Sequence, residues 1–153
     1  MSIWFRAAQI QQADMVFSGD GGLYVAGRWN HKGTQAIYCS QSLSLCTLEW
    51  LSHNGLSVSG FSYYKFSIEI PDELIIHYNI SDLPSEWDDT PSSNFNRDFV
   101  SKNFYTPKKY LAMAIPSVMV PEEFNLVINP LHSSFEKVQE TILALGEFTA
   151  PSR

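Results

Sequence analysis

The chain has 153 residues, of which 44% are hydrophobic and 17% are charged, so it suits one compact domain and is too apolar to be disordered. Its formal net charge is −6 and it has no basic stripe, which argues against nucleic-acid binding, because phosphate neutralisation supplies most of that affinity. No signal peptide is visible and no stretch has the roughly 18 apolar residues of a membrane span, so we expect a cytoplasmic protein with no membrane contact.

The first half of the chain carries strand and turn signals, followed by one clear helix. Strands are predicted over residues 3–7, 23–29 and 36–39. Turns are predicted at 20–22 and 30–33, because their glycines accept positive φ without steric cost. Ser42 is a suitable N-cap for the helix, and Asn54-Gly55 is a suitable stop.

The two cysteines give no sign of a metal site or of a disulfide framework. Cys39 and Cys46 lie in an apolar stretch without CxxC spacing. We therefore expect two buried, reduced thiols, and no metal-ligand pattern is predicted elsewhere in the chain.

The second half contains strands, a long polar excursion and a terminal helix. The segment 82–108 is polar and carries three prolines, and loops of this length often serve as lids or binding loops. Pro116 lies inside a predicted strand, which favours an edge position or a bulge. The predicted elements are strands over 61–70, 110–120 and 125–129 and helices over 96–102 and 134–145.

The order of these elements predicts the fold class. Strands in sequence, interrupted by few helices, indicate an α+β domain with a mainly antiparallel sheet and flanking helices. We expect a single domain over residues 1–146 and a flexible tail over 147–153.

Glu49 is an isolated charge. It is the only Asp, Glu, Lys or Arg between Lys32 and Lys65, and it lies in a helix with few polar side chains. A carboxylate in such surroundings is costly unless it is paired or faces a polar cleft. The alternative, a helix edge in contact with water, fits the sequence equally well.

Three further residues are candidates on weaker grounds. Arg28 follows Gly27 at a predicted strand end, and its planar fork of donors suits phosphate oxygens, although a surface arginine is the commoner case. Tyr38 and Ser117 lie in predicted strands, where a tyrosine usually fills the core and a serine often satisfies the backbone.

Several blocks of the chain resemble the RES-domain family. The first runs through Gly27-Arg28-Trp29-Asn30, Tyr38 and Leu48-Glu49, the second is the segment 115–121, and the third is the segment 129–132. Arg6 matches an early arginine of the family. The chain departs from the family pattern at Ser133-Ser134, where Pro-Asp is usual, and at Phe104, where a tryptophan is common.

The resemblance implies a fold similar to that of ADP-ribosyltransferase toxins, and a function. RES proteins are toxins of toxin–antitoxin systems that consume NAD, as hydrolases, phosphorylases or ADP-ribosyltransferases. The partner they imply is an Xre-type helix-turn-helix antitoxin, which assembles with the toxin into a hetero-oligomer and occludes its active site.

The resemblance also assigns roles to residues. Glu49 is expected to stabilise the positive charge that develops on the ribose when nicotinamide leaves. Arg28 and Arg6 are expected to hold the pyrophosphate, Tyr38 to pack on a ring of NAD, and Ser117 to orient Glu49 or the substrate. Asn30, in the same block as Arg28, is expected to contribute to NAD binding. Water, phosphate and a protein remain open as the final acceptor.

Overall fold

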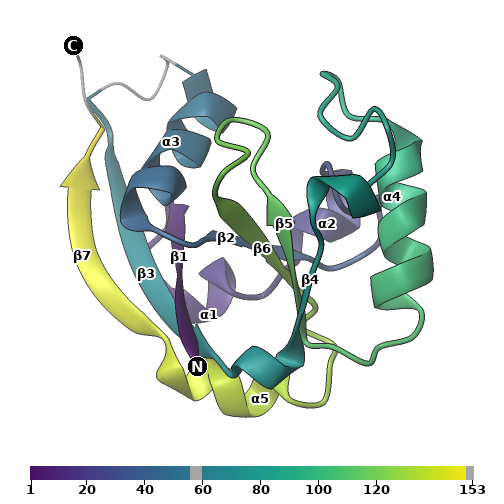
Figure 1. The fold of residues 1–153 in the computed structure, drawn as a ribbon. Coiled ribbons are helices and arrows are strands. Elements are labelled where there is room, and N and C mark those ends of the chain that lie inside the picture. The colour runs from purple at the N-terminus through teal and green to yellow at the C-terminus, as the bar shows by residue number, and fades with distance from the viewer. Residues whose placement is uncertain (56–59, 151–153) are drawn as a thin grey trace.

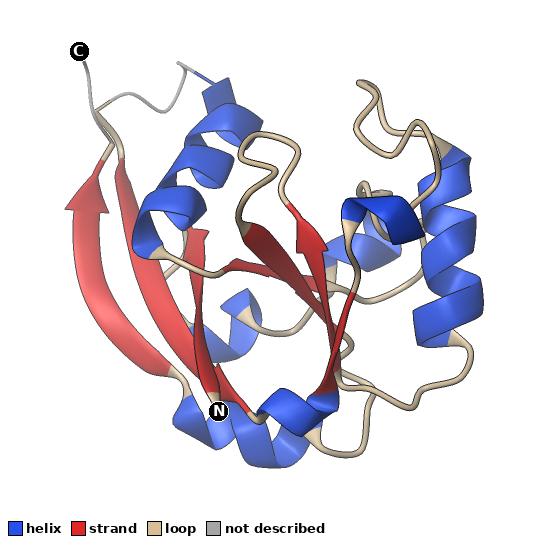
Figure 2. Cartoon of the chain, in the orientation of Figure 1, coloured by secondary structure: helices blue, strands red, loops and turns tan. Residues whose placement is uncertain are grey.

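In the computed structural model, which describes residues 1–55 and 60–150, seven strands of these ranges form one sheet in the order β4-β5-β6-β2-β1-β3-β7 (Figures 1 and 2). Neighbouring strands are antiparallel except for β4 and β5, which are parallel. The strands are β1 (Ser2–Ala8), β2 (Ile37–Ser40), β3 (Ser62–Ile70), β4 (Ile75–His77), β5 (Ala112–Pro116), β6 (Phe124–Ile128) and β7 (Leu143–Thr149). The α+β class with a mainly antiparallel sheet is thus confirmed.

Short helical segments surround one longer helix. The α-helices are α1 (Ala13–Val16), α2 (Gly21–Tyr24), α3 (Leu43–Asn54), α4 (Asn94–Val100) and α5 (Phe135–Val138). Single turns of 3-10 helix are η2 (Asp72–Leu74), η3 (Ile80–Asp82) and η5 (Gln139–Thr141), and α4 continues as the π-helical segment η4 (Ser101–Tyr105). No helix within the described ranges is long and apolar enough to cross a membrane.

The sheet divides into two parts at the contact between β1 and β2. These strands pair only at Phe5 and Ser40, whereas β1 pairs with β3 along the whole length of β1. Figure 1 shows β1, β3 and β7 on one side of the molecule and β4, β5 and β6 on the other, with α3 beside the first group and α4 beside the second. The arrangement leaves α3 and α4 on either side of the hairpin that joins β5 to β6.

The two faces of the sheet carry different side chains, because successive residues of a strand point to opposite faces. On β2, Ile37 and Cys39 point into the main core, where they pack with Phe17, beside α1, and Phe135 of α5. Tyr38 points to the other face, toward the core that α4 and η4 cover. Ser40 shares that second face, which is the face where the polar candidates of the sequence meet.

Helix α3 forms because its ends are capped as the sequence predicts. The Ser42 hydroxyl accepts a hydrogen bond from the Leu45 amide at 3.1 Å, which satisfies one donor of the first turn. Gly55 ends the helix with φ of +70°, a conformation that a side chain disfavours. The helix begins three residues after β2, so its first turns lie against the sheet beside β1 and β2.

The predicted strand over 23–29 is wrong. Gly21–Tyr24 form the short helix α2, and Gly27 and Asn30 bridge across a tight turn. Tyr24 and Val25 are 73% and 68% exposed, so strand propensity here has no partner strand to act on. The turn predicted at 20–22 is this helix, in which the backbone of Gly22 lies too close to the Thr34 carbonyl for any side chain.

The prediction for the C-terminal segment is also wrong. The expected helix over 134–145 is only α5 and η5, after which residues Leu143–Thr149 form β7 and pair with β3. Pairing from Ser62 to Ser67 satisfies backbone groups on the edge of β3 that faces away from β1. The flexible tail expected from residue 147 therefore does not begin there, and residues 151–153 lie outside the described residues.

Pro116 lies neither at a sheet edge nor in a bulge. It ends β5, which is flanked by β4 and β6. Strand β4 pairs with β5 only as far as Ala114, so the missing N–H of Pro116 faces no partner strand. The helix expected over 96–102 is present and begins earlier, as α4.

Cys39 and Cys46 are free and buried, as the sequence predicts. Burial raises the pKa of the Cys39 thiol to about 12 and that of the Cys46 thiol to about 11. In the unfolded chain the pKa of such thiols is about 8.5. The folded state therefore holds protons that the unfolded state loses, and this contribution to stability is complete below the unfolded pKa and declines as the pH rises through 11 to 12.

We predict that the free energy of unfolding falls between about pH 8.5 and pH 11, and that replacing both thiols in a Cys39→Ala/Cys46→Ala variant makes the fall shallower. Urea unfolding at pH 7.5, 9.5 and 10.5 measures both slopes. Equal slopes for the two proteins would show that the thiols do not contribute.

Candidate active site

Two side chains from the second half of the chain bind the Glu49 carboxylate. Its Oε1 accepts a hydrogen bond from Ser117 Oγ at 2.6 Å and another from Asn125 Nδ2 at 2.8 Å. Glu49 lies on α3, Ser117 directly follows β5, and Asn125 lies in β6. The Glu49 side chain is half-buried, and its Oε2 accepts no hydrogen bond from any of residues 1–55 and 60–150.

Ser117 is fully buried and its hydroxyl is saturated. Its Oγ accepts hydrogen bonds from the amides of Met119 (3.1 Å) and Val120 (3.2 Å), which folds the loop between β5 and β6 around it. The hydroxyl proton is then the group that Glu49 accepts. Ser117 therefore holds the carboxylate in place and closes the loop, rather than offering a free nucleophile.

The turn Gly27–Asn30 carries Arg28 and is held by hydrogen bonds within the turn and to Tyr38 on β2. The Asn30 side-chain oxygen accepts hydrogen bonds from the Gly27 amide (3.0 Å) and from the Tyr38 hydroxyl (2.6 Å). The Tyr38 hydroxyl in turn accepts from the Trp29 amide at 3.1 Å. Burial raises the pKa of the Tyr38 hydroxyl, so it stays protonated and keeps donating to Asn30.

Arg28 is half-buried and is anchored by one of its three nitrogens. Its Nη1 donates to the carbonyls of Trp87 (3.0 Å) and Asp89 (2.7 Å) in the segment before α4. Burial lowers the pKa of Arg28, and the negative charges of Asp88 and Glu49 oppose this effect. Arg28 and Glu49 are thus near enough for their charges to interact, while Nε and Nη2 of Arg28 have no protein partner among the described residues.

Helix α4 and the segment before it hold the Arg28 turn in place. Arg97 of α4 donates from Nε to the Gly27 carbonyl at 2.7 Å. Asn96, which is fully buried, donates to the same Trp87 carbonyl that binds Arg28, at 2.7 Å. The rings of Trp29 and Trp87 stack with their centroids 6.5 Å apart. The polar excursion that the sequence singles out therefore positions Arg28.

Arg6 donates to backbone carbonyls and not to the side chains of Glu49, Ser117 or Asn125. Its Nε donates to the Val16 carbonyl and its Nη1 to the Tyr38 carbonyl, both at 2.8 Å. Burial lowers the pKa of Arg6. Its side chain points to the same face of β1 as Trp4, which belongs to the main core. In this structure Arg6 ties α1 and β2 to β1, and it makes no hydrogen bond to Glu49.

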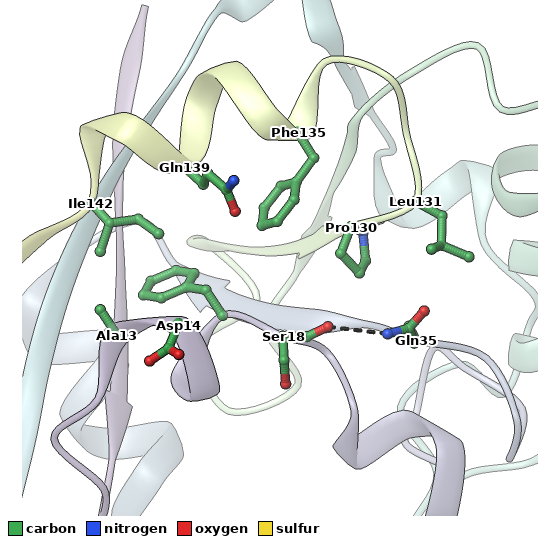
Figure 3. A pocket seen from close by; sticks show the side chains of 10 residues that line it. Ala13, Asp14, Ser18, Gln35, Pro130, Leu131, Phe135, Gln139 and Ile142 are labelled. Atoms are coloured by element: carbon green, nitrogen blue, oxygen red, sulfur yellow. Dashed lines mark hydrogen bonds between the residues drawn. The ribbon is translucent and has the colours of Figure 1, made fainter.

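A pocket of about 550 Å³ also lies apart from Glu49. Its lining includes Phe17, Gln35, Pro130, Phe135 and Ile142, whose side chains are drawn or labelled in Figure 3. Phe17 and Phe135 belong to the main core, on the face of β2 away from Ser40. The pocket is therefore separated by the sheet from the polar cluster around Glu49. Groups of three or more His, Cys, Asp and Glu that could hold a metal ion are absent from the part of the chain that the structure describes.

Of the residues named from sequence, Glu49 and Ser117 are in direct contact, and Asn30, Tyr38 and Arg28 form a second linked group nearby. The sequence analysis assigned no role to Asn125 and missed its contact with Glu49. The available signal was an amide in the otherwise apolar strand 124–128, on the face opposite to Leu126. A polar side chain in such a position needs a partner.

Comparison with known proteins gives close matches along nearly the whole chain. The family model of the RES domain matches residues 3–149. The chain is 35% identical over 142 residues to the "Toxin Res" of Yersinia enterocolitica, covering 93% of each chain. It is 30% identical over 151 residues to the "Toxin Res" of Photorhabdus laumondii, covering 99% of this chain and 96% of that one. A protein of Sphingobium sp. described as "Prs ADP-ribosylating toxin" is 35% identical over 136 residues, covering 86% and 83%.

The fold also resembles that of a solved structure. The crystal structure of the M. tuberculosis MbcT–MbcA toxin–antitoxin complex contains a chain that matches with a TM-score of 0.70. The match covers 99% of this chain and 85% of that one, at 14% sequence identity. At this identity the similarity is one of fold.

The Gly27 turn gives a test of the geometry around Arg28. A Cβ at Gly27 would lie 2.5 Å from both Asn30 Oδ1 and Tyr38 Oη, so Gly27→Ala should lower the free energy of unfolding by roughly 1–3 kcal/mol. Gly21→Ala is the matched control, since nothing lies within 4 Å of its added Cβ. Urea unfolding measures both variants. If both had the stability of the unaltered protein, the close packing of this turn would be wrong.

Proposed function

This chain belongs to the RES-domain family, and from that premise we propose that it is the toxin of a toxin–antitoxin pair that cleaves the bond between nicotinamide and ribose in NAD. The observation that carries the proposal is the half-exposed Glu49 carboxylate, oriented by Ser117 and Asn125 on the face of the sheet where Arg28 also lies. The names of two curated relatives, both "Toxin Res", support the biological role.

The chemistry that this site suits is the departure of a neutral leaving group from a sugar. Nicotinamide leaves NAD without needing a proton, and positive charge develops on the ribose in the transition state, as it does in glycoside cleavage. A fixed carboxylate beside the ribose stabilises that charge electrostatically. The Glu49 Oε2, which lacks a protein donor among the described residues, is the oxygen that would face the ribose.

The two unpaired nitrogens of Arg28 would hold the pyrophosphate. A guanidinium binds phosphate oxygens through parallel N–H donors, and Nη1 of Arg28 is already fixed by two carbonyls. Tyr38 and Asn30 affect this phosphate contact indirectly, because their hydrogen bonds shape the turn that carries Arg28. The half-buried ring of Tyr38 would form part of the wall of the NAD site. Arg6 supports the strand behind Tyr38 through its hydrogen bonds to the Val16 and Tyr38 carbonyls. We therefore assign Arg6 only a secondary contact with the phosphates of NAD.

A second candidate function is transfer of ADP-ribose to a protein. The specific observation in its favour is the 35% identity to the relative described as "Prs ADP-ribosylating toxin". The first step, loss of nicotinamide, is common to both functions. They differ in the acceptor, which is water or phosphate in the first case and a protein side chain in the second.

We also propose that the partner is an antitoxin with an Xre-type helix-turn-helix domain, bound in a cytoplasmic hetero-oligomer. The solved structure with the same fold comes from a toxin–antitoxin complex, which supports a protein partner of this kind. The net charge of −6 supports leaving DNA contacts to the partner, because an acidic toxin is repelled by phosphate.

Replacing Glu49 tests the proposed role of its carboxylate. Glu49→Gln keeps the size of the side chain and removes the charge, so kcat should fall at least about 100-fold while the protein stays folded. Nicotinamide release from NAD, followed by chromatography, measures the rate. Glu122→Gln is the control, because Glu122 is an exposed residue of the β5–β6 loop. Equal loss in both variants, or none in Glu49→Gln, would contradict the role.

Products identify the acceptor. With NAD alone, hydrolysis gives ADP-ribose and nicotinamide, and with added phosphate, phosphorolysis gives the phosphorylated ADP-ribose. Labelled NAD incubated with a bacterial lysate would instead mark a protein band if transfer to a protein were the main activity. If the purified protein released nicotinamide as fast without an acceptor protein as it does with the lysate, that result would count against transfer to a protein.

Arg28 is expected to act on NAD binding. Arg28→Lys keeps the charge and loses the planar fork, so we expect the KM for NAD to rise about tenfold, and more for Arg28→Ala. Steady-state kinetics with both variants measure the two effects. Unchanged KM in both variants would place the phosphates elsewhere.

A further inference from the structure

We propose that Asn125, held by Ser40, is a positioning residue that turns the Glu49 carboxylate before the substrate arrives. The pair Ser40–Asn125 supplies one of the two donors to Oε1 and thereby directs Oε2 toward the substrate. This inference rests on the proposed function, since it assigns a role within the same site. It adds two residues to those that the sequence pointed to.

Ser40 and Glu49 together hold the Asn125 amide, since Ser40 binds its oxygen and the carboxylate, which only accepts, binds its nitrogen. The two residues are directly opposite each other on β2 and β6, so their side chains emerge on the same face of the sheet. Ser40 Oγ donates to the Asn125 side-chain oxygen at 2.8 Å, and Ser40 is only 4% exposed. With its oxygen bound on that side, the amide presents its nitrogen to Glu49. Rotating the amide by half a turn would break the hydrogen bond to Glu49 and bring two acceptors, the amide oxygen and Oε1, together.

Both donors bind the same carboxylate oxygen. Ser117 has only its proton to give to Glu49, because its oxygen accepts two backbone amides. The Asn125 amide reaches the same Oε1 from the neighbouring strand. Two donors from different elements fix both the position and the rotation of a carboxylate, which a single donor would leave free to turn about that bond.

The consequence for catalysis is preorganisation. A carboxylate already aligned with the developing charge does not have to reorient during the reaction, and electrostatic stabilisation is most effective in that case. Loss of the alignment should therefore act on the transition state more than on NAD binding. A residue that only stabilised the fold would change the amount of active protein and leave the kinetic constants of the folded fraction unaltered.

Kinetics of two variants test this role. Asn125→Leu removes the donor, and Ser40→Ala removes one of the two hydrogen bonds that hold the amide. Each should lower kcat, by about 10- to 100-fold for Asn125→Leu and less for Ser40→Ala, with KM changed less than about threefold. Ser67→Ala is the matched control, since Ser67 is also a strand serine of low exposure, at 7%. Ser40→Ala keeps the test available if Asn125→Leu does not fold.

A second readout does not depend on NAD. Carbon-13 NMR of glutamate-labelled protein at a fixed pH of about 7.5 records the side-chain carboxyl signals, and Glu49→Gln identifies the Glu49 signal. The chemical shift of this signal should change in Asn125→Leu, which removes a donor to the carboxylate, and should stay the same in Ser67→Ala. If the unaltered protein released no nicotinamide while this shift was present, the proposed function would fall and the positioning role would stand. Active protein with unchanged kcat and an unchanged Glu49 chemical shift in both Asn125→Leu and Ser40→Ala would overturn the positioning role.

Discussion

A half-buried carboxylate needs hydrogen-bond donors, and in this protein the donors of Glu49 come from segments far along the chain. Ser117 and Asn125 lie 68 and 76 residues away from Glu49 in sequence, and they meet it only because α3 packs beside the hairpin of β5 and β6. The contact joins the helix to the sheet through groups that are costly to leave unpaired. The Ser117 hydroxyl that orients Glu49 also accepts the amides of Met119 and Val120, so one side chain links α3 to the shape of the β5–β6 loop.

The rest of the fold supports this contact from two directions. On one face of the sheet, an apolar core ties the strands to α1 and α5 and includes the pocket lined by Phe17 and Phe135. On the other face, hydrogen bonds from Asn30 and Tyr38 shape the turn that carries Arg28, and α4 closes against it. The negative group of Glu49 on α3 and the positive group of Arg28 on the turn are thereby both held on the face opposite to the main core. That combination suits a substrate with a cationic end and phosphates.

Local signals predicted much of the fold, and long-range pairing explains what they missed. Ser42 and Gly55 predicted both ends of α3, because capping depends only on neighbouring residues. Residues 143–149 form a strand rather than a helix because they pair with the edge of β3, about 80 residues earlier in the chain, and satisfy the backbone groups of that edge. In the site, Glu49 was predictable as the only charged residue of a long apolar stretch. Asn125 was not, because its partners Ser40 and Glu49 are distant in sequence and its role depends on strand register.

The most direct measurement of the central claim is a crystal structure of the protein with an NAD analogue whose glycosidic bond cannot be cleaved. The account predicts that the carbon joining the ribose to the nicotinamide lies beside Glu49 Oε2, that Ser117 and Asn125 still bind Oε1, and that Arg28 contacts the pyrophosphate. An analogue bound in the pocket between Phe17 and Phe135, with Glu49 untouched, would contradict it.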